Sequence, residues 1–159
     1  MFIYAVKAST LKFAGLLVLS VLALSMAVLL IPEESNIAVG NITLSEKDFK
    51  NIESAQDRVQ FLKLCGWETE AEAVAVPEFT IPAVFDGIYA TYNQLQSEMG
   101  LDLTGYKNKT VKRYTYIVTN YTYHGTVYAN LLIYDNKVIG GDITSANVDG
   151  FQKSLVKNT

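Results

Sequence analysis

The segment from residue 110 to residue 144 constrains the fold more than any other part of the chain. It reads TVKRYTYIVTNYTYHGTVYANLLIYDNKVIGGDIT. Aromatic and β-branched residues occupy both alternating faces of its first two parts, which is typical of β-strands. Asp135 and Asn136 follow the second part, and both residue types tolerate the positive φ that a type I′ hairpin turn requires. The pattern predicts three antiparallel strands joined by two tight turns, the first of them at 123–125.

Gly140 and Gly141 interrupt the third predicted strand. Paired glycines inside a strand indicate a β-bulge or the close approach of another backbone. A phosphate-binding loop is the alternative, but such loops precede a helix, and the chain contains no GxGxxG or P-loop pattern. We therefore expect a bulge or a close backbone contact here.

Two helices are predicted before this sheet. The first covers 54–65, with Ser54 or Asp57 as its N-cap and Gly66 at its end. The second covers 83–99, after a proline that favours the first turn of a helix. Its apolar residues fall at steps of three or four and predict one buried stripe. The stripe consists of Phe85, Ile88, Tyr89, Tyr92, Leu95 and Met99.

Two shorter segments flank these elements. Residues 68–76 alternate glutamate with small residues, which predicts a strand with a solvated acidic face, and a helical extension is the alternative. Residues 77–82 form an extended connector. In the tail at 145–159, Phe151 and Leu155 stand four residues apart, which predicts a short C-terminal helix.

Together these elements predict an α+β fold for residues 51–159. Two helices pack on one face of an antiparallel sheet of three or four strands, with 68–76 as the possible fourth. A helix followed by an antiparallel meander is similar to the cystatin arrangement, although this likeness is only an analogy.

Residues 13–31 are a run of 19 residues without charge or proline, long enough to cross a bilayer as a helix. Lys7 and Lys12 precede the run, and Glu33 and Glu34 follow it. This charge distribution predicts a cytoplasmic segment at 1–12, a single-pass signal anchor at 13–31 and the remainder outside the cytoplasm. A cleaved signal peptide, which would release a secreted protein, is the alternative.

Residues 32–50 are polar and are predicted to be a linker between the membrane and the domain. Within them, Ser45 is a candidate N-cap for a short helical turn, with Asp48 three positions later as its partner in a capping box.

Charge and cysteine content exclude some functions. No acidic residue precedes residue 13, so the remaining 11 of the 13 basic residues accompany all 16 acidic residues. This acidic balance argues against a nucleic-acid partner, which requires a basic face. Cys65 is the only cysteine, so neither an intrachain disulfide nor a cysteine-based metal cluster is possible. No residue pattern indicates a cofactor or a metal site.

Three stretches carry a resemblance to a family: FLKLCGW, KRYTYIVTNY and NLLIYDNKVIGGD. Between about residue 55 and residue 155 the chain resembles an uncharacterised domain of exported or membrane-anchored proteins of Gram-positive bacteria (Firmicutes). The resemblance implies a bacterial, extracytoplasmic setting. It implies no activity and no site residues, because that family has no assigned function.

The leading hypothesis is a non-catalytic domain that binds a protein, a peptide or an envelope component at the cell surface. Tyrosine is frequent in the predicted sheet, and its amphipathic ring suits binding surfaces. The alternative is that most of these rings fill the core and its rim. The candidate binding residues are Tyr114, Tyr116, Tyr128, Tyr134, Gly140, Gly141 and Asp142.

Two other hypotheses remain. One is a hydrolase of envelope material, with Asp142, Asp135, His124 and Lys112 as its candidate residues. These groups would have to lie within about 10 Å of one another, because proton transfer needs hydrogen-bond reach. The other is a regulatory subunit that acts through its membrane helix.

Overall fold

The computed structural model describes residues 19–22, 25–26, 36–39, 42–147 and 149–157. The chain divides into two compact units, Met1–Glu34 and Ser35–Thr159. Residues 19–22 and 25–26 of the first unit are helical. Among the described residues, no helix is both long enough and apolar enough to span a membrane. Most of the predicted anchor at 13–31 lies outside the described residues.

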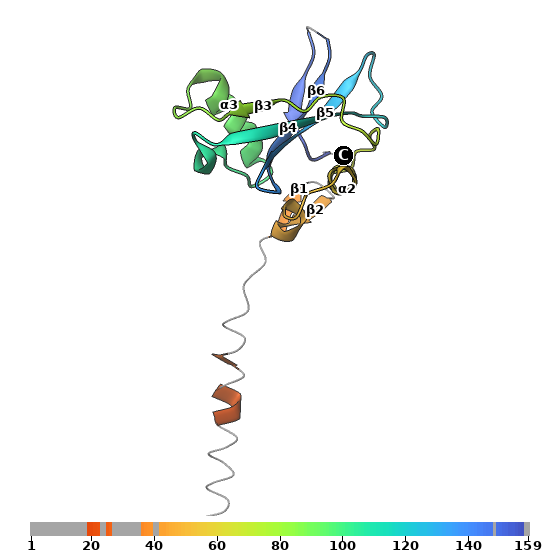
Figure 1. Ribbon diagram of the computed structural model, residues 1–159. Helices are drawn as coiled ribbons and strands as arrows, with labels where there is room; N and C mark the ends of the chain where they lie inside the picture. The colour runs from red at the N-terminus through yellow and green to blue at the C-terminus, as the bar shows by residue number, and fades with distance from the viewer. Residues whose placement is uncertain (1–18, 23–24, 27–35, 40–41, 148, 158–159) are drawn as a thin grey trace, which may run out of the picture. The chain divides into compact units, whose positions relative to one another are not determined.

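The second unit is built on a five-stranded antiparallel sheet (Figure 1). The strands are β3 (Glu78–Thr80), β4 (Thr110–Ile117), β5 (Val127–Tyr134), β6 (Lys137–Ser145) and β7 (Gln152–Ser154). They lie in the order β3-β4-β5-β6-β7. The α+β class and the three central strands were predicted, whereas the sheet has more strands than expected.

Local turn chemistry determines the β5–β6 hairpin. Asp135 and Asn136 adopt φ values of 49° and 57°, as a type I′ turn requires. Further along, Ile133 pairs with Val138 but Leu132 pairs with Gly140, so β6 holds one extra residue. The predicted bulge is therefore confirmed.

The predicted close backbone contact is also confirmed, at the second glycine of the pair. A Cβ atom on Gly141 would lie 2.5 Å from the carbonyl oxygen of Asn130 and 2.8 Å from Cδ2 of Leu155. Only glycine fits between these two groups.

Helix α2 (Ala55–Leu64) packs on one face of the sheet. The Arg58 Nε donates to the hydroxyl of Tyr116 at 2.9 Å, and the Arg58 guanidinium lies 3.9 Å from the ring centre of Tyr114. Phe61 and Leu62 of the same helix join a core that includes Ala129 and Leu131 of β5. Ser54 caps the helix and Gly66 follows it with a φ of 94°, so the predicted bounds are confirmed.

Helix α3 (Gly87–Ser97) contacts the other face of the sheet. Its Tyr92 hydroxyl donates to Asp142, which accepts a hydrogen bond from Asn130 of β5. Asn130 lies between Ala129 and Leu131, and successive side chains of a strand point to opposite faces. The prediction of two helices on one face is therefore wrong. β5 is apolar on both sides, since Leu132 belongs to a second core beneath the α3 face.

Helix α3 is shorter than predicted, and one of the six residues of its predicted stripe is exposed. It begins after Asp86, whose extended backbone interrupts the helix and whose carbonyl accepts the amides of Tyr89 and Ala90. Ile88, predicted to be buried, is 86% exposed, whereas Gln96 is fully buried. The other five residues of the predicted stripe are buried or half-buried, and Gln96 adds a polar contact to the sheet beside them.

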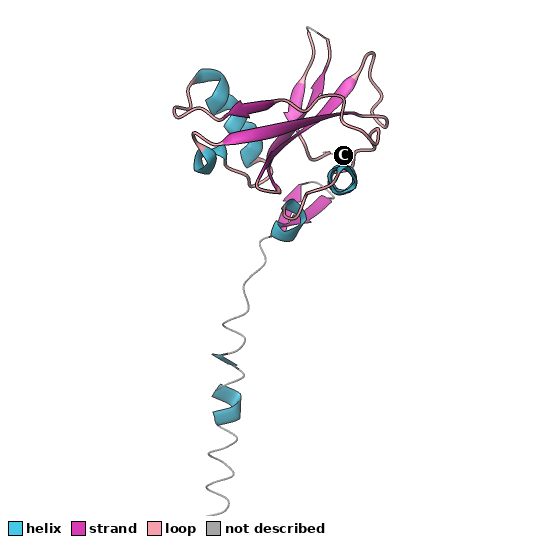
Figure 2. Cartoon of the chain, in the orientation of Figure 1, coloured by secondary structure: helices cyan, strands magenta, loops and turns pink. Residues whose placement is uncertain are grey.

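The predicted strand at 68–76 is wrong. Ala75 forms an isolated bridge with Thr115 of β4 and Thr69 forms another with Val118 just after β4, and the segment runs beside β4 as a loop (Figure 2). The amides of Glu70 and Val74 donate to Ile117 and Thr115, so four residues on one side match two on the other. The two surplus residues loop out and prevent a regular ladder. The three glutamates of the segment are exposed, as expected.

The described part of 32–50 is not a linker. It contains the hairpin β1 (Asn36–Val39) and β2 (Ile42–Ser45), followed by the 3-10 helix η1 (Glu46–Phe49). Leu44 and Phe49 are buried in the core of the second unit, which explains why this polar segment is ordered. The predicted partnership is confirmed, because the Ser45 amide donates to the Asp48 carboxylate at 2.7 Å.

The prediction of a C-terminal helix is also wrong, because the tail forms the edge strand β7. Pairing of Ile143 with Lys153 aligns β7 with β6. Leu155 is buried against Gly141 and helps to seat the tail on the sheet. The four-residue spacing of Phe151 and Leu155 is therefore accidental, since strand pairing over a long sequence separation determines this segment.

Candidate functional site

The predicted tyrosine-rich binding surface does not form one surface. Tyr114 and Tyr116 contact Arg58 of α2 on one face, whereas Asp142 contacts α3 on the other. The ring of Tyr134 packs edge-on against Tyr106 at 5.7 Å. Four members are buried and three are partly buried. The buried residues are Tyr116, Gly140, Gly141 and Asp142, and the partly buried ones are Tyr114, Tyr128 and Tyr134.

Asp142 is the centre of a buried polar network beneath α3. It is only 3% exposed and accepts hydrogen bonds from the Tyr92 hydroxyl at 2.8 Å, the Asn130 amide at 3.1 Å and the Thr144 hydroxyl. The Thr115 hydroxyl donates in turn to the side-chain oxygen of Asn130 at 2.8 Å. Three donors compensate for the burial of one carboxylate. The network therefore connects the strands β4, β5 and β6 with helix α3.

Two residues of α3 complete this attachment. The side-chain oxygen of Gln96 accepts the Gly141 amide at 2.7 Å. Burial, together with the Asp142 carboxylate, raises the pKa of Tyr92 well above its usual value. The phenol therefore stays neutral and donates to the carboxylate, which is a structural role.

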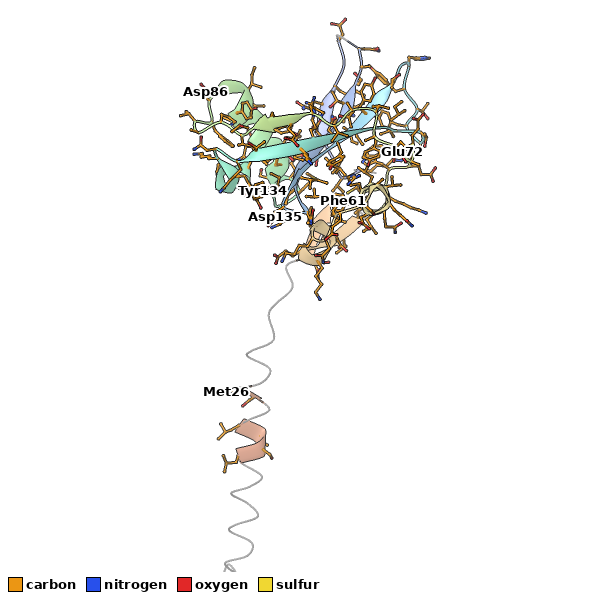
Figure 3. The ribbon with its side chains drawn as sticks, in the orientation of Figure 1. Met26, Phe61, Glu72, Asp86, Tyr134 and Asp135 are labelled. Atoms are coloured by element: carbon orange, nitrogen blue, oxygen red, sulfur yellow. The ribbon has the colours of Figure 1, made fainter. Side chains whose placement is uncertain are left out.

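The four candidate catalytic residues do not come together. Asp135 lies in the turn after β5 (Figure 3), and His124 lies in the connection before it. An eight-residue strand is about 25 Å long, so these two residues cannot share a proton. Lys112 is paired instead with Glu78 at 3.5 Å.

Other reactive groups also lack a suitable arrangement. Burial raises the pKa of the Cys65 thiol, which disfavours the thiolate that a nucleophile needs. Within the described ranges, no group of three His, Cys, Asp or Glu side chains is arranged to bind a metal ion. The labelled acidic residues Glu72 and Asp86 lie at opposite ends of the domain (Figure 3).

A groove beside β7 is the best candidate for a functional site. A cavity of about 440 Å³ lies between α3, the edge strand β7 and the segment that follows α2. A second hollow of about 610 Å³ continues along α3 and shares Leu95, Glu98 and Gln152 with the first. We call these two connected hollows the β7 groove.

Aromatic rings line one wall of the β7 groove. Trp67 and Tyr121 meet edge-on with ring centres 5.6 Å apart, and Tyr121 meets Phe151 at 5.5 Å. The Trp67 indole N–H donates to the carbonyl of Leu155, which fixes the orientation of the largest ring. Rigid aromatic walls of this kind offer a large contact area at a low cost in conformational entropy.

Two lysines lie on the same wall. Lys153 lies 4.8 Å from the ring centre of Phe151, and Lys157 lies 5.2 Å from that of Trp67. In the part of the chain that the structure describes, neither lysine forms an ion pair. This wall is therefore basic although the chain as a whole is acidic.

Ser154 adds a polar group to the lining. The residue is only 6% exposed, and its hydroxyl has no hydrogen-bond partner among the described residues. An unpaired buried hydroxyl is costly and is therefore uncommon. Its oxygen is almost fully covered by the protein, so the side chain forms part of the floor beneath the cavity.

The sequence of the tail contains a local signal for the edge strand of this site, although the tail was predicted to be a helix. Phe151, Lys153 and Leu155 alternate with Gln152 and Ser154, which is the period of a strand. The spacing of Phe151 and Leu155 also matched a helix, and the segment was too short to separate the two interpretations. The contact of Trp67 with the tail depends on the tertiary fold.

The fold and the groove define a small α+β domain with an open edge on its antiparallel sheet. The chain belongs to the family described as Domain of unknown function (DUF4830), whose model matches residues 61–143, just over half of the chain. No curated protein matches the chain, and no solved structure matches it either. The matched range contains Trp67, Leu95 and Tyr121, whereas β7 and its lysines lie outside it.

Proposed function

We propose that this protein is a non-catalytic binding module that takes an acidic segment of an envelope protein into the β7 groove. In this proposal the apolar segment 13–31 holds the domain at the outer face of the bacterial cell membrane. The observation that carries the proposal is the wall of the groove, where aromatic rings and two lysines without ion pairs line one cavity.

Charge complementarity supports an acidic partner. Lys153 and Lys157 are within reach of one ligand, and an incoming carboxylate gains two cations that have no ion-pair partner in the described chain. The rings of Trp67, Tyr121 and Phe151 provide the apolar contact that such a charged site needs for affinity.

The sequence of the first unit supports the anchor. At 1.5 Å per residue, 19 apolar residues extend about 28 Å, close to the thickness of the hydrocarbon layer. The apolar side chains that the structure describes in the segment 13–31 are exposed, as those of a lipid-facing helix would be. These are Leu19, Val21, Leu22 and Met26.

The fluorescence of Trp67 tests the binding proposal, since Trp67 is the single tryptophan and lines the groove. The full chain in detergent micelles is titrated with acidic, neutral and basic peptides of equal length. We expect a saturable change in emission with acidic peptides, and its loss in the variant Lys153→Glu/Lys157→Glu. The variant Lys112→Glu, which alters a lysine at the other edge of the sheet, is the control. No saturable response to any acidic peptide, or an equal response in the double variant, would contradict the proposal.

Membrane extraction tests the anchor separately. A charged residue at the centre of a spanning helix costs about 3 kcal/mol. We expect the full chain to remain with membranes after alkaline carbonate washing, and the variant Val21→Arg/Leu22→Arg to be released. Retention of the variant to the same extent as the parent would rule out the anchor.

A further inference from the structure

We infer that the bound segment is extended and adds to the free edge of β7 as a sixth strand of the sheet. The inference rests on the proposed function, and it specifies how the partner is recognised. Strand addition uses main-chain hydrogen bonds for affinity and alternate side chains for specificity.

The direction of the β7 backbone carries the inference. The Ser145 amide donates to the carbonyl of Phe151 at 3.1 Å, so the backbone groups of Phe151 face β6. In an antiparallel ladder this direction alternates from one residue to the next. The backbone amides and carbonyls of Gln152 and Ser154 therefore point away from β6, toward the open side of the sheet.

The position of the groove agrees with this direction. Ser154 pairs with Asp142 on the α3 side of the sheet, whereas Lys153 pairs with Ile143, whose side chain joins the core on the α2 side. Residues from both sides line the same cavity, so the groove crosses the edge of β7. An added strand would lie in this position.

The length of the groove also fits an extended segment. β7 has three residues, but the hollow continues along α3 past Leu95 toward Ile88. A segment that pairs with β7 therefore meets further lining beyond the three-residue ladder.

Charge distinguishes an acidic segment from a second copy of the chain. Antiparallel pairing of two β7 strands would bring the Lys153 side chains of the two copies close together, and like charges in neighbouring positions are unfavourable. Lys157 lies on the same wall and adds to the repulsion. An acidic strand gains from both lysines.

The two walls of the groove predict the pattern of the partner. Side chains that point to one wall meet Trp67, Tyr121 and the two lysines, and those that point to the other meet Leu95 of α3 and Glu98 just after it, the latter of which disfavours acidic residues on that side. A strand alternates between the two sides. The preferred segment therefore alternates acidic residues on the lysine side with apolar residues on the Leu95 side.

N-methylated peptides test strand addition. The probe is a synthetic peptide of about nine residues that alternates valine with aspartate, and its binding to the full chain is followed by Trp67 fluorescence. Two derivatives carry N-methyl groups either on all valine amides or on all aspartate amides. In an added strand only one of these two sets faces β7. We expect one derivative to bind at least about tenfold more weakly and the other to bind within about threefold of the parent.

The outcomes separate the two proposals. If both derivatives bind as the parent does, strand addition is overturned while acidic-segment binding survives. If the parent peptide does not bind, the proposed function itself fails. If the peptide instead dissociates a dimer detected by sedimentation, the occupant of the edge is a second copy, and the inference is overturned.

A protein variant provides a second measurement. Gln152→Pro removes one amide that points away from β6, and proline is tolerated at such positions on edge strands. We expect unchanged circular dichroism and binding of the parent peptide weakened at least about tenfold. A folded variant with unchanged affinity would contradict strand addition at this residue.

Discussion

The two edges of the sheet differ in composition and in shape. At the β4 edge, the acidic segment 68–76 and the short strand β3 cover the ladder, and Pro77 lies between them. Surplus residues loop out of this edge, which blocks regular pairing with another chain. At the opposite edge, β7 is basic and faces a hollow lined by aromatic rings. Proline and irregular backbone are common ways to prevent pairing at a sheet edge, and only the first edge has them, so the regular β7 edge is the one to associate with function.

The charges of the two edges also favour opposite partners. Glu68, Glu70 and Glu72 are exposed on the first edge and would repel an acidic strand. Lys153 and Lys157 would attract the same strand on the second. An acidic segment would thus be attracted to one edge of the sheet and repelled by the other. This difference would restrict its binding to a single position.

The largest expected effect concerns the seating of β7. In Gly141→Ala the new Cβ atom would meet the Asn130 carbonyl at 2.5 Å, and this backbone atom cannot move without disturbing β5. We expect the free energy of unfolding to fall by about 3 kcal/mol in urea denaturation. Gly105→Ala is the control, because no atom lies within 4 Å of its added Cβ, and it should change stability by less than about 0.5 kcal/mol. Equal stabilities of the two variants would show that neither Asn130 of β5 nor Leu155 of the tail encloses Gly141 closely.

The second prediction reverses the charge of the β7 edge. Lys153→Glu/Lys157→Glu should weaken the binding of an acidic peptide about 100-fold, because two attractions become repulsions. Lys112→Glu, at the opposite edge, should change the affinity by less than about threefold. Titration calorimetry at low and high salt measures both effects. A loss of affinity in Lys112→Glu comparable to that in the double variant would place the ligand at the wrong edge.

The third prediction concerns alkaline pH and the core behind the β7 groove. Cys65 is buried there, and its carbonyl accepts the Lys157 amide. Burial raises the pKa of its thiol above the ordinary value of 9.0. Above pH 9 the unfolded chain therefore binds fewer protons than the folded chain, so stability falls as the pH rises, by about 1.4 kcal/mol per unit.

Urea denaturation of the parent and of Cys65→Ala at a series of pH values measures this effect. The parent should lose roughly 2 kcal/mol more than the variant between about pH 8 and pH 10.5. Tyr92, whose pKa is also raised, contributes to both proteins and cancels in the comparison. Parallel stability curves would mean that the thiol behind the groove is accessible to water.

The smallest expected effect concerns the acidic edge. Glu68→Gln/Glu70→Gln/Glu72→Gln removes exposed charges, so the free energy of unfolding should change by less than about 0.5 kcal/mol. The affinity of an acidic peptide for the β7 groove should stay within about twofold, since none of the three glutamates lines the groove. Self-association measured by sedimentation should rise slightly, because the edge has lost its repulsion. A large fall in stability would instead assign these glutamates a structural role.

Local chemistry explains which elements were predictable from the sequence. The Asp135–Asn136 turn, the glycine bulge and the Ser54 cap depend on residues adjacent in the chain, and all three were found. The β7 strand was missed because its pairing with β6 and the burial of Leu155 depend on tertiary contacts. The placement of α3 on the second face of the sheet was missed for a similar reason, since it depends on the contacts of Tyr92 and Gln96 with β6.

The site was harder to predict than the fold. The many tyrosines predicted a site in the middle of the sheet. The alternation of residues along a strand does not show which of its two faces is buried in the core and which is at the surface. The groove joins residues from α3, from the segment after α2 and from the tail, and no local pattern connects Trp67 with Lys153. Only the end of the chain, with its alternating Phe151, Lys153 and Leu155, contained a local signal.

The most direct test of the account is an NMR titration of the ¹⁵N-labelled full chain in micelles with the alternating valine–aspartate peptide. The central claim is that the β7 edge, and not the β4 edge, receives the ligand. The account predicts that the amides of Gln152 and Ser154 and the indole of Trp67 shift together and saturate at one peptide concentration. Shifts confined to Glu78–Thr80 and the segment 68–76 would contradict it.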